Sequence, residues 1–225
     1  MKKLLVLLSL VVATSLVATA TFAVTDGNKV TSKLGAKQEV QYQQLKVNTS
    51  NFFGSVSKPF SVPNFLYGKP LFKSQNNTDN YEQIVNNFFR TYPDLFQVTI
   101  SDFRVEVQKP KDRNITQVHL FQEYQNVPVF GAELIFTFND KKELISYTGK
   151  YTPHVSIAVK PKTSKGKIQN IVTQDLSVNT ITEQPRLFIF NKGILTNTQE
   201  STKLVWRLGT NGWVYFIDAD TLLAG

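Results

Sequence analysis

Hydrophobic side chains follow two different periods along the chain, and these periods predict where helices and strands lie. Between Asp79 and Tyr92 the apolar residues recur at spacings of three and four, which is the period of an amphipathic helix. Asp79 can cap this helix together with Glu82 three residues later, and Pro93 ends it. A weaker pattern of the same kind predicts a second helix over 168–178.

Seven runs of β-branched, aromatic and alternating residues have the character of strands. They are Phe103–Gln108, Thr116–Tyr124, Val129–Phe138, Glu143–Tyr151, Arg186–Asn191, Thr202–Leu208 and Trp213–Ile217. The polar residues 139–142 and the pair Asn211-Gly212 separate neighbouring strands in the manner of hairpin turns. The pattern therefore predicts an α+β protein with two small modules, each an antiparallel sheet with one helix.

The remaining segments set the expected domain boundaries. Residues 24–78 are rich in Gln, Asn, Ser and Thr and are punctuated by prolines, which predicts an N-terminal segment of mostly irregular or short extended structure. Residues 152–166 contain prolines and several lysines and are interpreted as a linker. The first domain is then expected over 79–151 and the second over 167–225.

One strand-like stretch, FQEYQNVPVFGAEL, is interrupted by a proline and a glycine three residues apart. We expect Asn126 to Pro128 to end one strand, because proline cannot donate a hydrogen bond to a sheet. Gly131 suits a place where the backbone bulges or is closely approached. The interruption is therefore interpreted as a tight connection between two strands of one antiparallel sheet.

The first 23 residues have the order of a secretory signal peptide. Lys2 and Lys3 precede an apolar run, and small residues follow up to Ala20 or Ala23, after either of which cleavage is expected. No later apolar segment is long enough to cross a bilayer. We therefore expect a secreted or extracytoplasmic protein with no transmembrane segment after signal cleavage.

Charge and cysteine content narrow the classes of partner. The formal net charge is +8, and removal of the two signal lysines leaves 8 − 2 = +6. Basic residues are scattered except in the tract Lys160–Lys167, which has no aromatic residue for base stacking, so nucleic-acid binding is not expected. Attraction to an acidic protein or an anionic wall polymer stays open. The absence of cysteine excludes disulfides and thiolate chemistry.

No arrangement of residues in the sequence predicts catalysis. The motifs HExxH and GxSxG and the phosphate-binding loops are absent. His119 and Glu123 would lie about 13 Å apart along a strand, too far to share a metal ion. Asp218 and Asp220 could form a carboxylate pair, although a role in the turn at the strand end explains them as well. We expect no catalytic residue, no metal site and no cofactor.

Two stretches resemble a known module. Residues 118–134, VHLFQEYQNVPVFGAEL, and residues 139–149, NDKKELISYTG, are similar to the FTP motif of fungalysin and thermolysin propeptides. Residues 203–207 and 212–221 are similar to the closing hairpin of a PepSY domain, the usual neighbour of that motif. Leu222 stands where that family has glycine, and the helix expected at Ile168 lacks the family's alanines.

The resemblance implies which residues shape the two modules. These motif residues, expected to be structural rather than catalytic, are Gln122, Asn126, Pro128, Phe130, Gly131, Gly149, Trp206, Asp218 and Ala219.

The same resemblance implies a function. In precursors of this kind the pro-region assists folding of a thermolysin-like metallopeptidase catalytic domain and then inhibits it. Three hypotheses follow: a stand-alone inhibitor or folding chaperone, a truncated N-terminal part of a secreted zinc endopeptidase precursor, and an envelope-associated binding module without a peptidase partner.

Overall fold

A computed structural model describes residues 34–111, 113–174 and 180–220, so the predicted signal peptide over 1–23 lies outside the described residues. The described residues divide into two compact units. The first unit contains 34–156 and 189–202, and the second contains 157–188 and 203–220. Strand β7 contributes its last three residues, 189–191, to the first unit.

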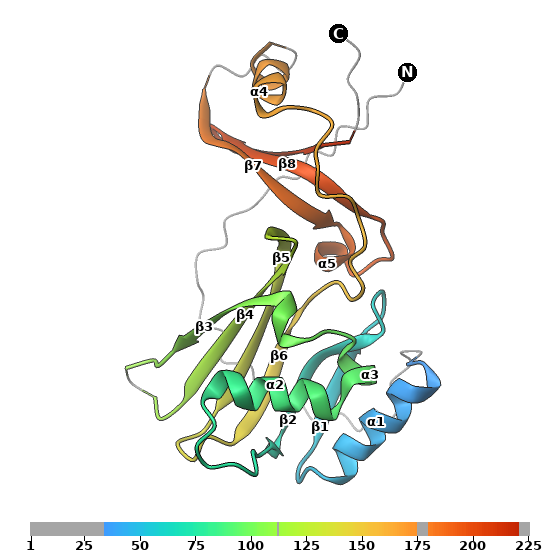
Figure 1. The fold of residues 1–225 in the computed structure, drawn as a ribbon, viewed down its shortest axis with the longest axis vertical. Coiled ribbons are helices and arrows are strands. Elements are labelled where there is room, and N and C mark those ends of the chain that lie inside the picture. The colour runs from blue at the N-terminus through green and yellow to red at the C-terminus, as the bar shows by residue number, and fades with distance from the viewer. Residues whose placement is uncertain (1–33, 112, 175–179, 221–225) are drawn as a thin grey trace. The chain divides into compact units, whose positions relative to one another are not determined.

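The first unit is built around an antiparallel sheet whose strands follow the order β1-β2-β6-β5-β4-β3 (Figure 1). The six strands are β1 (Phe53–Ser57), β2 (Val62–Phe72), β3 (Phe103–Gln108), β4 (Thr116–Tyr124), β5 (Val127–Phe138) and β6 (Leu144–Lys150). The predicted strand pattern was correct for β3 and β4 and within two residues for β5 and β6. The helices and strands of the chain are in keeping with the predicted α+β class.

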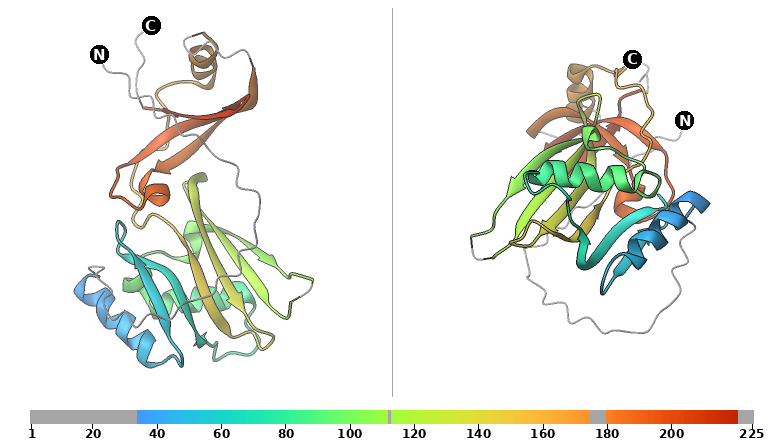
Figure 2. Two further views of the ribbon diagram at one scale, coloured as in Figure 1. Left: turned by 180° about the vertical axis from the view of Figure 1, so that it is seen from behind. Right: turned by 60° about the horizontal axis from the view of Figure 1, so that its bottom comes forward.

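Helices pack against one face of this sheet. They are α1 (Ala36–Val47), α2 (Tyr81–Thr91) and the short α3 (Pro93–Phe96), followed by a single 3₁₀ turn at Ile100–Asp102. Figure 1 shows α2 crossing the sheet on the near side, and Figure 2 shows the strands from behind, with α2 beyond them. The core between helices and sheet is aromatic, because Phe88 and Phe89 of α2 contact Phe96 and Phe136 edge-on or tilted.

The prediction of mostly irregular or short extended structure over 24–78 was wrong for helix α1 and for the length of strand β2. Helix α1 and strands β1 and β2 lie there. The helix escaped detection because its buried positions are Gln38, Tyr42 and Leu45, at helical spacing, but the first is polar. The Gln38 amide donates to Ser61 O at 2.5 Å, so this polar side chain is buried with its hydrogen bond made.

The N-terminus of α2 differs from the predicted one by a residue. Asn80 caps the helix: its side chain accepts from Gln83 N at 2.8 Å, and the Gln83 side chain accepts from Asn80 N at 2.7 Å. Asp79 was expected to be the cap, but its carboxylate instead accepts hydrogen bonds from Ser74 and Asn87. The buried Asp79 therefore joins the preceding loop to the helix.

The second unit contains helix α4 (Lys165–Gln174), strand β9 (Trp213–Asp218) and most of strands β7 (Ile181–Asn191) and β8 (Thr202–Thr210). Residues 175–178 of the predicted helix lie outside the described residues. Its core consists of Ile168, Val172 and Leu208 with Trp206 among the residues packed against them. The hairpin predicted at Asn211-Gly212 is present, because Thr210 pairs with Trp213, and Gly212 takes a positive φ of 90°.

Candidate interaction face and pocket of the first unit

The sheet of the first unit has one face that no described helix covers (Figure 2). Residues that pair across neighbouring strands form a row, and their side chains point to the same side of the sheet. Phe136, Tyr147 and Leu66 form one such row and are fully buried. The side chains of the adjacent rows therefore point to the opposite side of the sheet. We call the opposite side the open face. Its residues are Phe53, Ser55, Phe65, Tyr67, Arg104, Glu106, His119, Phe121, Glu133, Ile135, Thr137, Ser146 and Thr148.

Aromatic side chains lie at both ends of the open face. Phe53 on the edge strand β1 is 61% exposed and contacts the Phe65 ring at a centroid distance of 5.8 Å. Towards the other edge, the Arg104 guanidinium lies 4.5 Å from the centroid of the Phe121 ring. Mixed aromatic, hydroxyl and charged side chains of this kind are typical of protein interaction surfaces.

The charged groups of the open face are paired with one another. Arg104 forms an ion pair with Glu106, and its Nε lies 3.5 Å from a carboxylate oxygen of Glu123. The hydrogen bond to Glu106 raises the pKa of Arg104 above its ordinary value. His119 Nδ1 lies 2.7 Å from Glu133 Oε1, while its Nε2 is buried without a hydrogen-bond partner among the described residues.

The structure shows how the candidate pairs from the sequence, His119 with Glu123 and Asp218 with Asp220, are arranged. His119 pairs with Glu133 on the neighbouring strand rather than with Glu123. Asp218 Oδ1 accepts from Asp220 N at 2.9 Å, and its other carboxylate oxygen lies 3.4 Å from Lys203 Nζ, so Asp218 forms a local turn and an ion pair. Within the described ranges there is no cluster of three or more residues that could hold a metal ion.

A pocket opens where strands β2 and β6 part. Tyr67 pairs with Ser146 and Phe72 with Leu144, so four residues of β2 face a single residue, Ile145, across the gap. Ile145 is also the extra residue of a bulge, because the register between β5 and β6 shifts there. Pro70 belongs to the bowed part of β2, where its missing N–H suits an unpaired position. The stretch Gly68-Lys-Pro70 is the sequence feature that could have indicated this opening, because glycine and proline are both unfavourable inside a strand.

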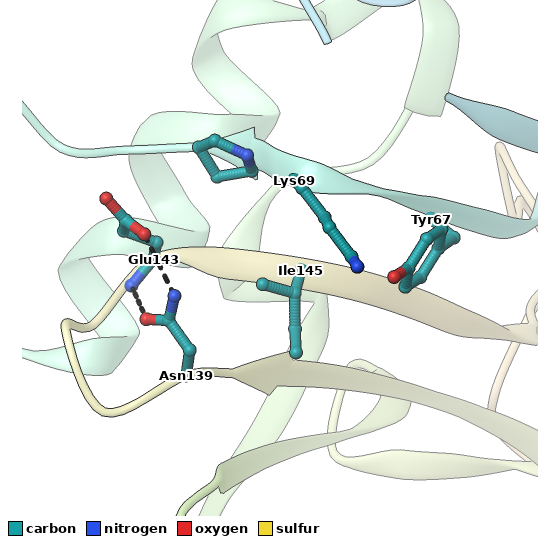
Figure 3. Close-up of a pocket in the computed structure, with 6 residues that line it drawn as sticks. Tyr67, Lys69, Asn139, Glu143 and Ile145 are labelled. Carbon is teal, nitrogen blue, oxygen red and sulfur yellow. Dashed lines mark hydrogen bonds between the residues drawn. The ribbon is translucent and has the colours of Figure 1, made fainter. Parts of the chain in front are cut away.

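The pocket has an apolar floor and a polar end (Figure 3). It measures about 290 Å³, and its lining residues are Tyr67, Lys69, Pro70, Asn139, Glu143 and Ile145. Figure 3 shows the Lys69 side chain running along β2 towards the Tyr67 hydroxyl, above Ile145. At the polar end Asn139 Nδ2 donates to Glu143 at 2.9 Å, and this hydrogen bond, with Lys73 3.5 Å away, lowers the pKa of Glu143.

The turn before β5 differs from the predicted one. Strand β4 continues to Tyr124, and the two-residue turn is Gln125-Asn126, both with positive φ (49° and 64°). The expectation that Asn126 to Pro128 ends a strand was therefore wrong: Pro128 lies within β5 and pairs with Glu123.

The Pro-Val-Phe-Gly stretch is a wide bulge of β5. Between the pairs Phe121–Glu133 and Glu123–Pro128 the register shifts, and Gly131 takes a φ of 74°. The bulge expected at Gly131 is thus present. The bulge contacts residues 189–202, and these contacts explain its function within the fold.

Residues 189–202 pack against this bulge. Val129 pairs in parallel with Ile189 of β7, and the Phe130 ring contacts that of Phe190 at 6.1 Å. The short helix α5 (Gly193–Thr196) follows, and Lys150 Nζ donates to Ile194 O at 2.9 Å. The bulge therefore provides the seat for this later segment of the chain.

Gln122 and Gly149 support the same part of the sheet. The Gln122 amide donates to Thr152 O at 2.7 Å and accepts from Thr152 N at 3.0 Å, which replaces strand pairing where β5 bulges away. A Cβ on Gly149 would lie 2.1 Å from Glu133 O, so only glycine fits there.

The three motif residues of the second unit hold its closing hairpin. Trp206 Nε1 donates to Thr163 O at 2.8 Å. Ala219 is fully buried; its N–H donates to Leu204 O, and its carbonyl accepts from Lys162 N and Thr163 N. With Asp218 in a turn, these residues lie apart from the open face in sequence and belong to a different unit.

The first unit is thus an antiparallel sheet with one helix-covered face and one open face. Residues 102–151 match the family model of the Fungalysin/Thermolysin Propeptide Motif. The match spans β3 to β6 and includes the bulge, but it does not extend to the residues that resemble a PepSY domain. No curated protein matches the chain. None of the described helices is long and apolar enough to cross a membrane.

Proposed function

We propose that this chain is a secreted, pro-region-like protein that inhibits a thermolysin-like zinc metallopeptidase, assists its folding, or does both. The observation that carries the proposal is the match of residues 102–151 to the propeptide motif. A motif of this kind implies association with a peptidase catalytic domain. The hairpin at 203–221 is interpreted as part of a PepSY domain, which accompanies the motif in such precursors.

The open face is the surface that we assign to this association. It carries the exposed ring of Phe53, several half-buried aromatic rings, and Ser and Thr side chains. The charged side chains of its strands are paired with one another, so little unpaired charge would be desolvated on binding. Inhibitory interfaces of standard size bury roughly 1,600 Å², which a six-stranded sheet face can supply in large part.

An inhibition and refolding assay tests the proposal. Protein comprising residues 24–225 is titrated into thermolysin and into an isolated fungalysin catalytic domain, and separately into the same domains during refolding from urea. We expect inhibition at micromolar concentration or better, or a higher yield of refolded enzyme. The Gly131→Val variant, strained at a positive φ, should lose both effects together with its stability. The absence of both effects with the unmodified protein would refute the proposal.

A second candidate function is favoured by the same match, because the motif is by its description part of a propeptide. In this reading the chain is the front part of a secreted zinc endopeptidase precursor. Sequencing the source DNA beyond the codon for Gly225 distinguishes the two: an open frame that reaches an HExxH motif supports a precursor, and a stop codon supports a stand-alone protein.

A further inference from the structure

The pocket between β2 and β6 adjoins the open face, with which it shares Tyr67. The apolar part of its lining consists of the Tyr67 ring, Pro70 and Ile145. Its volume of about 290 Å³ is below the range of roughly 300–1,000 Å³ that sites for drug-sized ligands and cofactors occupy. A space of this size and polarity suits one apolar side chain better than a free small molecule.

The charges at the rim are not balanced. Glu143 is satisfied, because it accepts from Asn139 and lies 3.5 Å from Lys73. Lys69 is exposed and forms no ion pair within the part of the chain that the structure describes. The pocket therefore combines an apolar floor with one unneutralised cation at its edge, and the whole chain has a net charge of +8. This combination complements an apolar side chain that lies next to a carboxylate.

We propose that this pocket is the anchor socket of the open face, and that it receives an apolar side chain flanked by an acidic residue on the surface of the peptidase catalytic domain. The inference rests on the proposed function, which it deepens by naming the contact. Interface energy concentrates in a few side chains that fill well-packed pockets, so a single socket can decide affinity. The bulge at Ile145 and the bow of β2 that form the socket belong to the strand framework, and the socket is therefore preformed.

Two substitutions in the full chain test the socket. Ile145→Trp fills it, and Lys69→Glu reverses the charge at its rim without changing a buried residue. Val40→Trp, at an exposed position of helix α1 and outside the open face, and Lys109→Glu, an exposed lysine after β3, are the matched controls. Circular dichroism and urea unfolding establish that each variant is folded before its inhibition constant for thermolysin and for a fungalysin catalytic domain is measured.

We expect each socket variant to weaken inhibition about tenfold or more and each control to change it less than about threefold. The Lys69→Glu variant should also show a smaller dependence of affinity on salt than the unmodified protein. If Ile145→Trp fails to fold, Lys69→Glu alone decides, since its site is exposed.

The outcomes separate the socket from the proposed function. Inhibition by the unmodified protein together with unchanged inhibition by folded socket variants would overturn the socket and leave the function standing. The absence of inhibition and refolding assistance by the unmodified protein would overturn both. Self-association of the chain that is lost in the socket variants would assign the socket to a second copy, and would likewise overturn its assignment to a peptidase.

Discussion

At the scale of single residues, Gly149 shows how one position can control the stability of the sheet. It takes a φ of 148° and faces Leu134 on β5, and any Cβ would clash with the backbone of Glu133 and Leu134. We predict that Gly149→Ala lowers the free energy of unfolding by about 2–4 kcal/mol, because the backbones of β5 and β6 must move apart to make room for the Cβ. Urea unfolding of the full chain measures this loss.

Gly166→Ala is the control for this substitution. Nothing lies within 4 Å of a Cβ at Gly166, which is in helix α4, so alanine there should be neutral or stabilise by up to about 1 kcal/mol. An equal loss of stability in both variants would contradict the steric explanation for Gly149.

Two buried tyrosines predict how the first unit responds to alkaline pH. Tyr147 donates its hydroxyl hydrogen to Pro63 O at 3.0 Å, and Tyr151 donates to Phe96 O at 2.6 Å. Burial raises the pKa of both hydroxyls well above the ordinary value of 10.0. The folded state therefore keeps these protons when the unfolded state loses them. Their contribution to stability is complete below pH 10 and is lost progressively as the pH rises above it.

The expected result is a steep fall in the free energy of unfolding above about pH 10. The double variant Tyr147→Phe, Tyr151→Phe has no hydroxyl protons to lose at these positions and should show a shallower fall over the same range. Urea unfolding at a series of pH values from neutral upward measures both slopes. Equal slopes would show that other groups cause the alkaline sensitivity.

At the scale of elements, the β4–β5 hairpin has a turn whose first residue is poorly suited to its conformation. Gln125 has a φ of 49°, a region that glycine occupies at little cost. We predict that Gln125→Gly raises the free energy of unfolding by about 0.5–1 kcal/mol, since both central residues of such a turn need positive φ. Asn126→Ala, with the next residue at 64°, should lower it. Thermal unfolding distinguishes these opposite signs, and a lower melting temperature for Gln125→Gly would be inconsistent with the turn geometry.

The elements also show what sequence reasoning could reach. Strands β3 and β4 were predicted with their observed ends, because their alternating residues pack against one face and polar residues follow them. Helix α1 was missed, because Gln38 occupies a buried position and forms its hydrogen bond to Ser61, a residue 23 positions later. Such a partner cannot be inferred from local pattern.

At the scale of the whole molecule, the first unit is completed by a segment from outside the propeptide motif. Ile194 of α5 is 1% exposed and would lie 3.4 Å from a Cβ on Gly131, so its side chain packs on the bulge. We predict that Ile194→Ala lowers the free energy of unfolding by about 2–4 kcal/mol. Hydrogen exchange should also become faster at Val129 and Ala132, which are buried at this contact.

The neighbouring Leu195 also lies at the bulge, 3.5 Å from a Cβ on Gly131, but its side chain is 40% exposed, so its truncation gives a graded comparison. Leu195→Ala should cost less than about 1 kcal/mol and accelerate exchange in the bulge less than Ile194→Ala does. If Ile194→Ala accelerated exchange only within 180–210 and not in the bulge, the packing of α5 would not stabilise the motif.

The sequence by itself determined the strands of the motif, the helix at 81–91 and the identity of the motif, because these depend on residues that are close together in the chain. Only the tertiary structure showed that the Pro-Val-Phe-Gly stretch seats residues 189–202, that Gln122 clamps Thr152, and that a pocket opens beside Ile145. Each of these features arises where strand pairing fails. The groups that replace the missing pairing come from distant parts of the chain, and local periodicity contains no information about them.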